Sequence, residues 1–181
     1  MTAPLEDQIR AALDAFARLE VEGARVRENE VVNRFVFECL LPRLEKGLPL
    51  HAPGQLGIEV TVPQIEGRGG ARKHPDVRKD LVIWSEPGET CWSREDGRPV
   101  HWPLAVLEFK VASWKDGPAE ARGKLVDGRE ADLDWLERAT VAAGRMLGFS
   151  VVVDASRAPW TTDVALVSGG QVRPKWWASA R

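Results

Sequence analysis

The stretch LAVLEFKVASW, residues 104–114, has the composition of a strand with two charges set into an apolar run. Successive side chains of a strand point to opposite faces of a sheet, so Glu108 and Lys110 share one face with Val106. Residues 104–107 are all apolar, which predicts that this face is covered. The alternative is an exposed charged pair on an edge strand, which contributes little to stability. Because buried charges need partners or a metal, the covered face predicts a chemical site.

An acid stands ahead of the preceding apolar run, in the stretch DLVIW at residues 80–84. This run predicts a strand that pairs with residues 104–111 as a hairpin and brings Asp80 opposite Glu108 and Lys110. The alternative is that Asp80 only marks the entry to a strand or a turn. Two carboxylates supply hard oxygen ligands for Mg²⁺, and an adjacent lysine can orient a water or stabilise charge on a phosphate. These residues therefore predict a site for metal-assisted hydrolysis of phosphodiesters.

The rest of the chain predicts an α/β (α+β) domain with a mixed sheet. Helical spacing and short apolar runs predict helices at 4–22, 25–46 and 131–147 and strands at 57–65, 80–84, 104–111, 149–153 and 164–167. Pro42 predicts a kink or an early end in the second helix, and Pro63 predicts an edge position or a bulge in the first strand. At 181 residues the chain is predicted to form one domain, 1–181, in which the helix 4–22 and the tail 168–181 are additions to the core.

The acid before one apolar run and the Glu-x-Lys within the next resemble the motif of the PD-(D/E)XK nuclease superfamily. The resemblance covers about residues 25–154 and implies the restriction-endonuclease-like fold, an αβββαβ core with a mixed central sheet flanked by helices. The literal Pro-Asp pair of this sequence is Pro75-Asp76, four residues before the predicted strand. We expect Asp76 to lie in the loop, so Asp80 is the preferred acid and Asp76 the lesser candidate.

Many members of this family carry a further glutamate on a helix ahead of the sheet. The stretch RENEVVNRFVFECLL, residues 27–41, resembles that helix and offers Glu28, Glu30 and Glu38. Glu28 falls on the apolar helical face and is preferred, although a first-turn glutamate also favours a helix N-terminus without any chemical role. The resemblance then implies Mg²⁺, with Mn²⁺ as a substitute, and a metal site made by Asp80, Glu108, Glu28 and the backbone carbonyl of Phe109. Lys110 is expected to position the attacking water.

The resemblance also implies DNA as the substrate and an endonuclease as the activity. A basic stretch precedes Asp80, and its side chains could contact phosphates beside the metal site; they are Arg72, Lys73, Arg78 and Lys79. The alternative is a solvated loop. Some family members also place a polar or basic residue of the following helix near the scissile phosphate, and Lys124, Arg138 and Arg145 are available here.

Composition argues against several classes of function. A net charge of −2 and a pI near 6.0 argue against a protein that coats nucleic acid through bulk charge. The apolar runs are too short for a membrane span and no secretory signal is visible, so we expect a cytoplasmic protein that does not enter membranes. The cysteines and histidines have neither disulfide nor zinc spacing. The tryptophan pair Trp176 and Trp177 could stack bases, but more often such a pair closes a core or a contact in a homodimer or with a partner protein.

Two hypotheses follow. The first is a Mg²⁺-dependent deoxyribonuclease in which Asp80, Glu108, Glu28 and Lys110 form the active site. The second is a catalytically inactive nuclease-like scaffold that binds protein or nucleic acid. A set of two acids and a lysine favours the first, because a pure scaffold has no need for three costly charges close together.

Overall fold

The computed structural model describes residues 3–19, 27–65, 76–113, 115–156 and 160–179. Within these residues the chain forms one six-stranded mixed sheet in the order β1-β2-β3-β4-β5-β6. Its strands are β1 (Leu56–Pro63), β2 (Asp76–Ile83), β3 (Ala105–Ser113), β4 (Leu147–Ala155), β5 (Thr161–Ser168) and β6 (Gln171–Ala178). The β3–β4 pair is parallel, and the other neighbours are antiparallel. This confirms the predicted α/β class with a mixed sheet.

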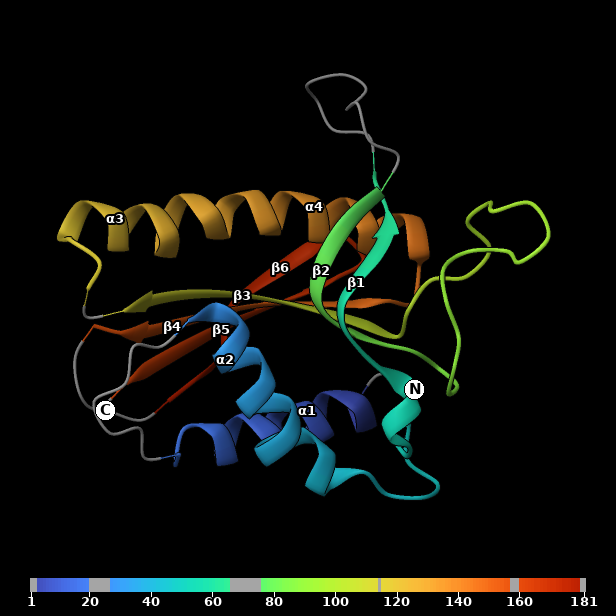
Figure 1. Ribbon diagram of the computed structural model, residues 1–181, viewed down its shortest axis with the longest axis horizontal. Helices are drawn as coiled ribbons and strands as arrows, with labels where there is room; N and C mark the ends of the chain where they lie inside the picture. The colour runs from blue at the N-terminus through green and yellow to red at the C-terminus, as the bar shows by residue number, and fades with distance from the viewer. Residues whose placement is uncertain (1–2, 20–26, 66–75, 114, 157–159, 180–181) are drawn as a thin grey trace.

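Helices cover both faces of the sheet (Figure 1). One face packs against α1 (Ala3–Phe16), α2 (Glu28–Arg34) and its continuation as a π-helical turn (Phe35–Leu40) and a 3-10 turn (Leu41–Arg43). The other face packs against α4 (Gly128–Ala143), which follows α3 (Pro118–Arg122) and a π-helical segment (Gly123–Asp127). Burial of apolar side chains on each side of the sheet stabilises this three-layer arrangement.

The strand at 104–111 occupies the position that its sequence predicts. β3 pairs with β2 on one side and with β4 on the other, so it lies inside the sheet. Its apolar side chains are buried on both faces, with Leu107 and Phe109 toward α1 and α2, and Val106 toward α4. The alternative of an exposed edge strand is therefore wrong, because both neighbouring strands are paired to it.

The apolar side chains of β1 and β2 change face halfway along both strands. In a regular strand, residues an even number of positions apart point to the same face. Here Ile58 of β1 and Leu81 of β2 point toward α1 and α2, whereas Val60 of β1 and Val77 of β2 point toward α4. Glu59 and Asp80 lie between these sets, and Glu59 has a φ of 54°, a left-handed conformation that costs energy in a residue with a side chain. The hairpin twists sharply here and bends toward α4 (Figure 1). Asp80 lies at this twist, in mid-strand.

The helices differ from their predicted bounds. The first, predicted at 4–22, ends at Phe16, where three-residue turns such as Leu19 N–H to Phe16 O replace α-helical bonds; residues 20–26 lie outside the described part. The second ends at Arg43 just past Pro42, the early end that proline predicts. The third begins at Gly128 and ends at Ala143 rather than 147, because Gly144 takes φ 68° and caps it.

The tail predicted as an addition, 168–181, contributes strand β6 at the sheet edge. The sequence does not indicate this strand, because Pro174 and the charges around it are typical of loops. An edge strand tolerates proline and charges. Trp177 is buried, and its indole N–H donates to Asp14 Oδ1 at 2.8 Å. Trp176 packs on Phe149 at 5.3 Å between ring centroids. The pair thus closes a core.

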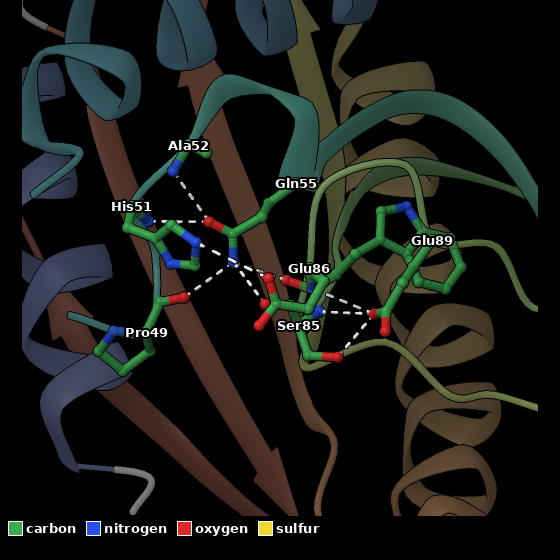
Figure 2. A network of polar contacts seen from close by, with 8 residues as sticks. Pro49, His51, Ala52, Gln55, Ser85, Glu86 and Glu89 are labelled. Atoms are coloured by element: carbon green, nitrogen blue, oxygen red, sulfur yellow. Dashed lines mark hydrogen bonds and ion pairs between the residues drawn. The ribbon is translucent and has the colours of Figure 1, made fainter. Parts of the chain in front are cut away.

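One buried side chain fixes the loop that leads into β1. Gln55 is fully buried; its side-chain carbonyl accepts from the N–H groups of His51 and Ala52, at 2.8 and 2.9 Å. Its amide lies within 3.0 Å of the carbonyl oxygens of Pro49, Trp84 and Ser85. Figure 2 shows this side chain joining the loop before β1 to the residues after β2. In the part of the chain that the structure describes, no helix combines the length and apolarity needed to cross a membrane.

Candidate active site

Strands β2 and β3 separate beside the two predicted acids. Their pairing runs from Ile83–Ala105 to Leu81–Leu107 and stops there. At the next position, the backbone N–H of Phe109 donates to Asp80 Oδ2 at 2.7 Å, and the N–H of Asp80 lies 3.4 Å from Glu108 Oε2. Side chains thus replace backbone partners at this point. The predicted convergence of Asp80 and Glu108 is what the structure contains.

Asp80 stands between two grooves in the surface. One groove is lined by Glu28, Asn29, Val32, Asn33, Ile58, Glu59 and Asp80. The other, of about 270 Å³, is lined by residues of β2, β3 and α4, among them Asp80, Glu108, Lys110, Asp132, Trp135 and Arg138. Asp80 is half-buried and borders both. A ligand that reached this carboxylate could extend into either groove.

Glu108 is a buried acid held by a buried base. Its carboxylate pairs through Oε1 with the ammonium of Lys79, and both side chains are 5% exposed. Burial raises the pKa of Glu108 to about 7; Lys79 opposes this rise, whereas Asp80 and Asp132 add to it. A divalent cation beside this carboxyl would favour its ionised form.

Lys110 is fixed by an acid that the sequence analysis did not select. Its ammonium lies 2.9 Å from Asp132 Oδ2 on α4 and donates to the carbonyl of Phe109 at 3.1 Å. Burial would lower the pKa of Lys110, but the Asp132 carboxylate, with help from Glu28 and Glu108, raises it. Lys110 is therefore held in its protonated form.

Helix α4 makes room for this lysine. A Cβ atom added to Gly128 would lie 3.0 Å from Lys110 Cδ and 3.2 Å from Cε. The aliphatic stem of Lys110 therefore runs directly across the first turn of α4. A glycine at this position allows the ammonium to reach Asp132, one turn further along the helix.

The structure separates the three glutamates offered by α2 and its π-helical continuation. Glu28, the first residue of the helix, lines the groove with Asp80; partial loss of water raises its pKa, with Lys110 opposing and Asp80 and Asp132 adding to the rise. Glu30 instead accepts from the backbone N–H of Arg27 at 3.0 Å, and Glu38 pairs with Arg34 at 2.7 Å. Glu28 is thus the glutamate of this helix that is electrostatically coupled to the site. It is an exposed residue, so it reaches the site from the solvent side.

The basic residues do not form one group. Arg72 and Lys73 lie outside the described residues, so their predicted DNA contacts are not addressed by the structure. Arg78 and Lys79 belong to β2, and the prediction that they lie in a loop is wrong because β2 begins at Asp76. Arg78 is exposed and lies 3.3 Å from Glu59, whereas Lys79 is buried against Glu108.

Of the basic residues that follow β3, only some reach this region. Arg138 lines the groove of Glu108 and Lys110, and its guanidinium pairs with Asp134 at 2.6 Å. Lys124 pairs with Asp116 at 2.7 Å and is electrostatically coupled to Glu28. Arg145 borders a different cavity, with Leu104 and Leu147. Asp76, the lesser acid, is exposed as the first residue of β2, so the predictions that it lies in the loop and that the strand begins at Asp80 are wrong.

Asp132 was missed from the sequence, and Lys79 was selected as a phosphate contact rather than as the partner of Glu108. Asp132 precedes Trp135, Leu136 and Ala139 at helical spacing, so it belongs to the helix face that meets the sheet, and this spacing could have identified it. No sequence signal indicates that Lys79 pairs with Glu108. Regular strand alternation places its side chain on the face opposite Asp80, away from Glu108. The twist at Asp80 brings it to the α4 face.

The oxygens of Asp80, Glu108, Glu28 and Phe109 have the chemistry that Mg²⁺ prefers. These groups already have partners within the protein. Glu108 pairs with Lys79, Asp80 accepts from the Phe109 N–H, and the Phe109 carbonyl accepts from Lys110. Over the described ranges, no three or more Asp, Glu, His or Cys side chains are grouped so as to hold a metal ion. The donor set fits a hard cation by its chemistry but not by its present arrangement.

Comparisons with known proteins give no relative. No family model matches the chain, no curated protein matches it, and no solved structure matches it.

Proposed function

We propose that this protein is a metal-dependent nuclease that hydrolyses phosphodiester bonds of DNA, on a restriction-endonuclease-like core. The observation that carries the proposal is the meeting of Asp80 and Glu108 where β2 and β3 separate, with the Lys110 ammonium fixed beside them. The order α2, β1, β2, β3, α4, β4, with β3 and β4 parallel, agrees with the αβββαβ core that the motif implies. DNA as the substrate rests on the resemblance of the motif.

Mg²⁺, or Mn²⁺ in its place, would supply Lewis-acid stabilisation of a phosphoryl oxygen when bound. Asp80 and Glu108 would hold it with the Phe109 carbonyl, and Glu28 would approach from the solvent side. Each of these groups offers oxygen, and the acids bring the negative charge that a divalent cation needs. Raised pKa values of Glu28 and Glu108 mean that ionisation of these acids and cation binding favour each other.

Lys110 acts as a donor in this proposal. An ammonium has three N–H groups; one donates to the Phe109 carbonyl, and the Asp132 carboxylate is the ion-pair partner at 2.9 Å. A remaining N–H can bond the attacking water or a phosphate oxygen. Because Asp132 keeps Lys110 protonated, its role is to orient and to stabilise developing negative charge rather than to remove a proton.

Arg78 and Arg138 border the groove that contains Glu108 and Lys110. Guanidinium groups bind phosphate well, and contacts to phosphates fix the register of a nucleic acid without reading its sequence. In this proposal the DNA strand passes between the first half of β2 and α4. The scissile phosphate then lies next to Lys110. The Arg138 pairing with Asp134 would have to yield in part to phosphate.

One observation favours a second function, a nuclease-like scaffold without catalysis. Lys79 already neutralises Glu108, so the site can exist as a closed set of ion pairs that needs no metal. On this alternative the protein binds protein or nucleic acid through its surface. It predicts that neither Mg²⁺ nor Mn²⁺ raises the melting temperature and that Asp80→Ala leaves every measured function unchanged.

The test compares wild type, Lys110→Met and Lys46→Met on supercoiled, linear and single-stranded DNA with Mn²⁺. Methionine keeps the unbranched stem across Gly128 but removes the ammonium, whereas Lys46 is exposed and outside both grooves. We expect cleavage by wild type and Lys46→Met, and a loss of about 10²- to 10⁴-fold in Lys110→Met. Equal cutting by all three proteins would trace the activity to a contaminant or to different chemistry. No cutting by wild type on any of the DNAs would favour the scaffold.

A further inference from the structure

Lys79 holds the position that a cation ligand of Glu108 would take. It is 4% exposed, and its ammonium pairs directly with Glu108 Oε1. The same ammonium lies 3.9 Å from the centroid of the Trp135 ring on α4. Lys79 is thus enclosed between a carboxylate of β3 and an aromatic face of the covering helix.

Burial of a lysine is costly, and this one is stabilised by two attractive contacts. An ion pair offsets the loss of water around both charges only when its geometry is good, and a tryptophan face adds a cation–π interaction. Both contacts exist because the twist at Asp80 turns Lys79 to the α4 face instead of the opposite one. The residue beside one acid of the site is therefore the counter-ion of the other.

Besides Lys79, a second polar side chain lies next to Glu108, that of Ser150. Ser150 on β4 pairs in register with Glu108, so the two side chains are neighbours on the same face. Ser150 is fully buried, and among the described residues its hydroxyl oxygen has no hydrogen-bond partner. A buried hydroxyl without a partner is unfavourable. The register therefore places a buried hydroxyl beside the Glu108 carboxylate, which could accept from it if Glu108 left Lys79.

We infer that Lys79 is a built-in competitor of the divalent metal, which masks Glu108 until the metal displaces its ammonium. The inference rests on the proposed function, because it describes how that same site takes up its metal. A monovalent ammonium and a divalent cation compete for the same oxygen lone pairs of Glu108. Metal binding to wild type is then weakened by the Lys79–Glu108 pair, and the metal releases Lys79 toward the groove in which the phosphate would lie.

The main experiment is calorimetric titration of Mn²⁺ alone into folded wild type, Lys79→Met and Lys46→Met at physiological ionic strength. Methionine at position 79 keeps the stem against Trp135 and removes the charge. Lys46→Met is the matched control, because it makes the same substitution at an exposed lysine outside both grooves. We expect Lys79→Met to bind Mn²⁺ at least about tenfold more tightly than wild type and Lys46→Met to differ by less than about threefold, since exposed charges are screened.

Several results would overturn the inference. Equal tightening in both variants would mean a general charge effect, and weaker binding in Lys79→Met would mean that Lys79 orients Glu108 for the metal. If wild type binds Mn²⁺ and Lys79→Met binds no better, the proposed function stands and the competitor role fails. If neither protein binds Mn²⁺, the proposed function fails and the inference with it.

A measurement on wild type covers the case in which Lys79→Met does not fold. Acetylation by an amine-reactive reagent, followed by mass spectrometry, reports how accessible each lysine is with and without saturating Mn²⁺. We expect labelling of Lys79 to be low in the metal-free protein and to rise at least severalfold with Mn²⁺, while Lys46 labels equally in both. Labelling of Lys79 that does not change with bound Mn²⁺ would overturn the inference.

Discussion

The backbone N–H of Phe109 donates a hydrogen bond of 2.7 Å to Oδ2 of Asp80, just past the last paired residues of β2 and β3, Leu81 and Leu107. One carboxylate oxygen thus takes the place of a backbone acceptor on the neighbouring strand. The carboxylate has a second oxygen that can face a cation. Asp80 therefore combines a structural role, which needs only an acceptor, with a chemical role that needs a negative charge.

Asp80→Asn separates these two roles. The amide oxygen can still accept from Phe109, so we expect the free energy of unfolding to stay within about 1 kcal/mol of wild type. The lost charge should lower Mn²⁺-dependent DNA cleavage by about 10²-fold or more. Asp76→Asn is the control, because Asp76 is an exposed acid of the same strand. This variant should cut DNA as wild type does. Loss of cleavage in Asp76→Asn with normal cutting by Asp80→Asn would reverse the assignment of the acid.

Gly128→Ala should impair the site while it leaves the fold intact. Alanine favours helix over glycine by about 1 kcal/mol, but its methyl group would press on the Lys110 stem at 3.0 Å. We expect unchanged or higher thermal stability and cleavage lowered by about tenfold or more, because small displacements of reacting groups are costly. Gly123→Ala is matched within the same helical run, since among the described residues its added methyl would meet Asp127 Oδ2 alone, at 3.9 Å. Equal activity of the two variants would contradict the fixed position of Lys110.

The sequence predicted the convergence of Asp80 and Glu108 better than the bounds of the helices. Alternation in residues 104–111 and the acid at Asp80 were sufficient, because period-two patterns are robust in a strand buried on both faces. Lys79 could not be placed, since its orientation depends on a twist in the hairpin that no local pattern encodes. Asp132 is different: helical spacing places it on the face toward the sheet, but nothing in its local sequence pairs it with Lys110 on another element. Strand β6 was missed because an edge strand can carry proline and charges.

Glu108 should make the stability of the protein depend on pH. Its pKa is about 7 in the folded protein and near 4.5 when unfolded, so between these values the folded state holds more protons. Stability from this group is therefore full below about pH 4.5 and falls as pH rises to about 7, by at most about 3 kcal/mol. Glu108→Gln should flatten this part of the stability curve, measured by urea denaturation from pH 5 to 8, whereas Glu45→Gln, on the surface, should leave it unchanged. Parallel curves for wild type and Glu108→Gln would contradict the raised pKa.

Gln55→Ala tests the loop clamp drawn in Figure 2. The substitution removes bonds to backbone groups of His51, Ala52 and Trp84 and leaves buried polar groups without partners. We expect a loss of about 3 kcal/mol or more in the free energy of unfolding, measured by urea denaturation with tryptophan fluorescence. Gln64→Ala is the control, because among the described residues that side chain accepts a hydrogen bond from its neighbour Ile65 alone, and it should cost less than about 1 kcal/mol. Similar losses in both variants would argue against the clamp.

Glu28 and Glu30 lie two residues apart on α2 and should respond differently to the same change. Glu28 shares a groove with Asp80, whereas Glu30 accepts from the Arg27 N–H at the helix start. Glu28→Gln removes a charge coupled to the site and should weaken Mn²⁺ binding by about tenfold, because a carboxylate is a far better ligand for hard cations than an amide. Glu30→Gln should keep wild-type affinity for Mn²⁺ and lower stability by less than about 1 kcal/mol, since only one helix-end contact changes. Calorimetry with Mn²⁺ measures both, and weaker binding in Glu30→Gln alone would move the ligand role from Glu28 to Glu30.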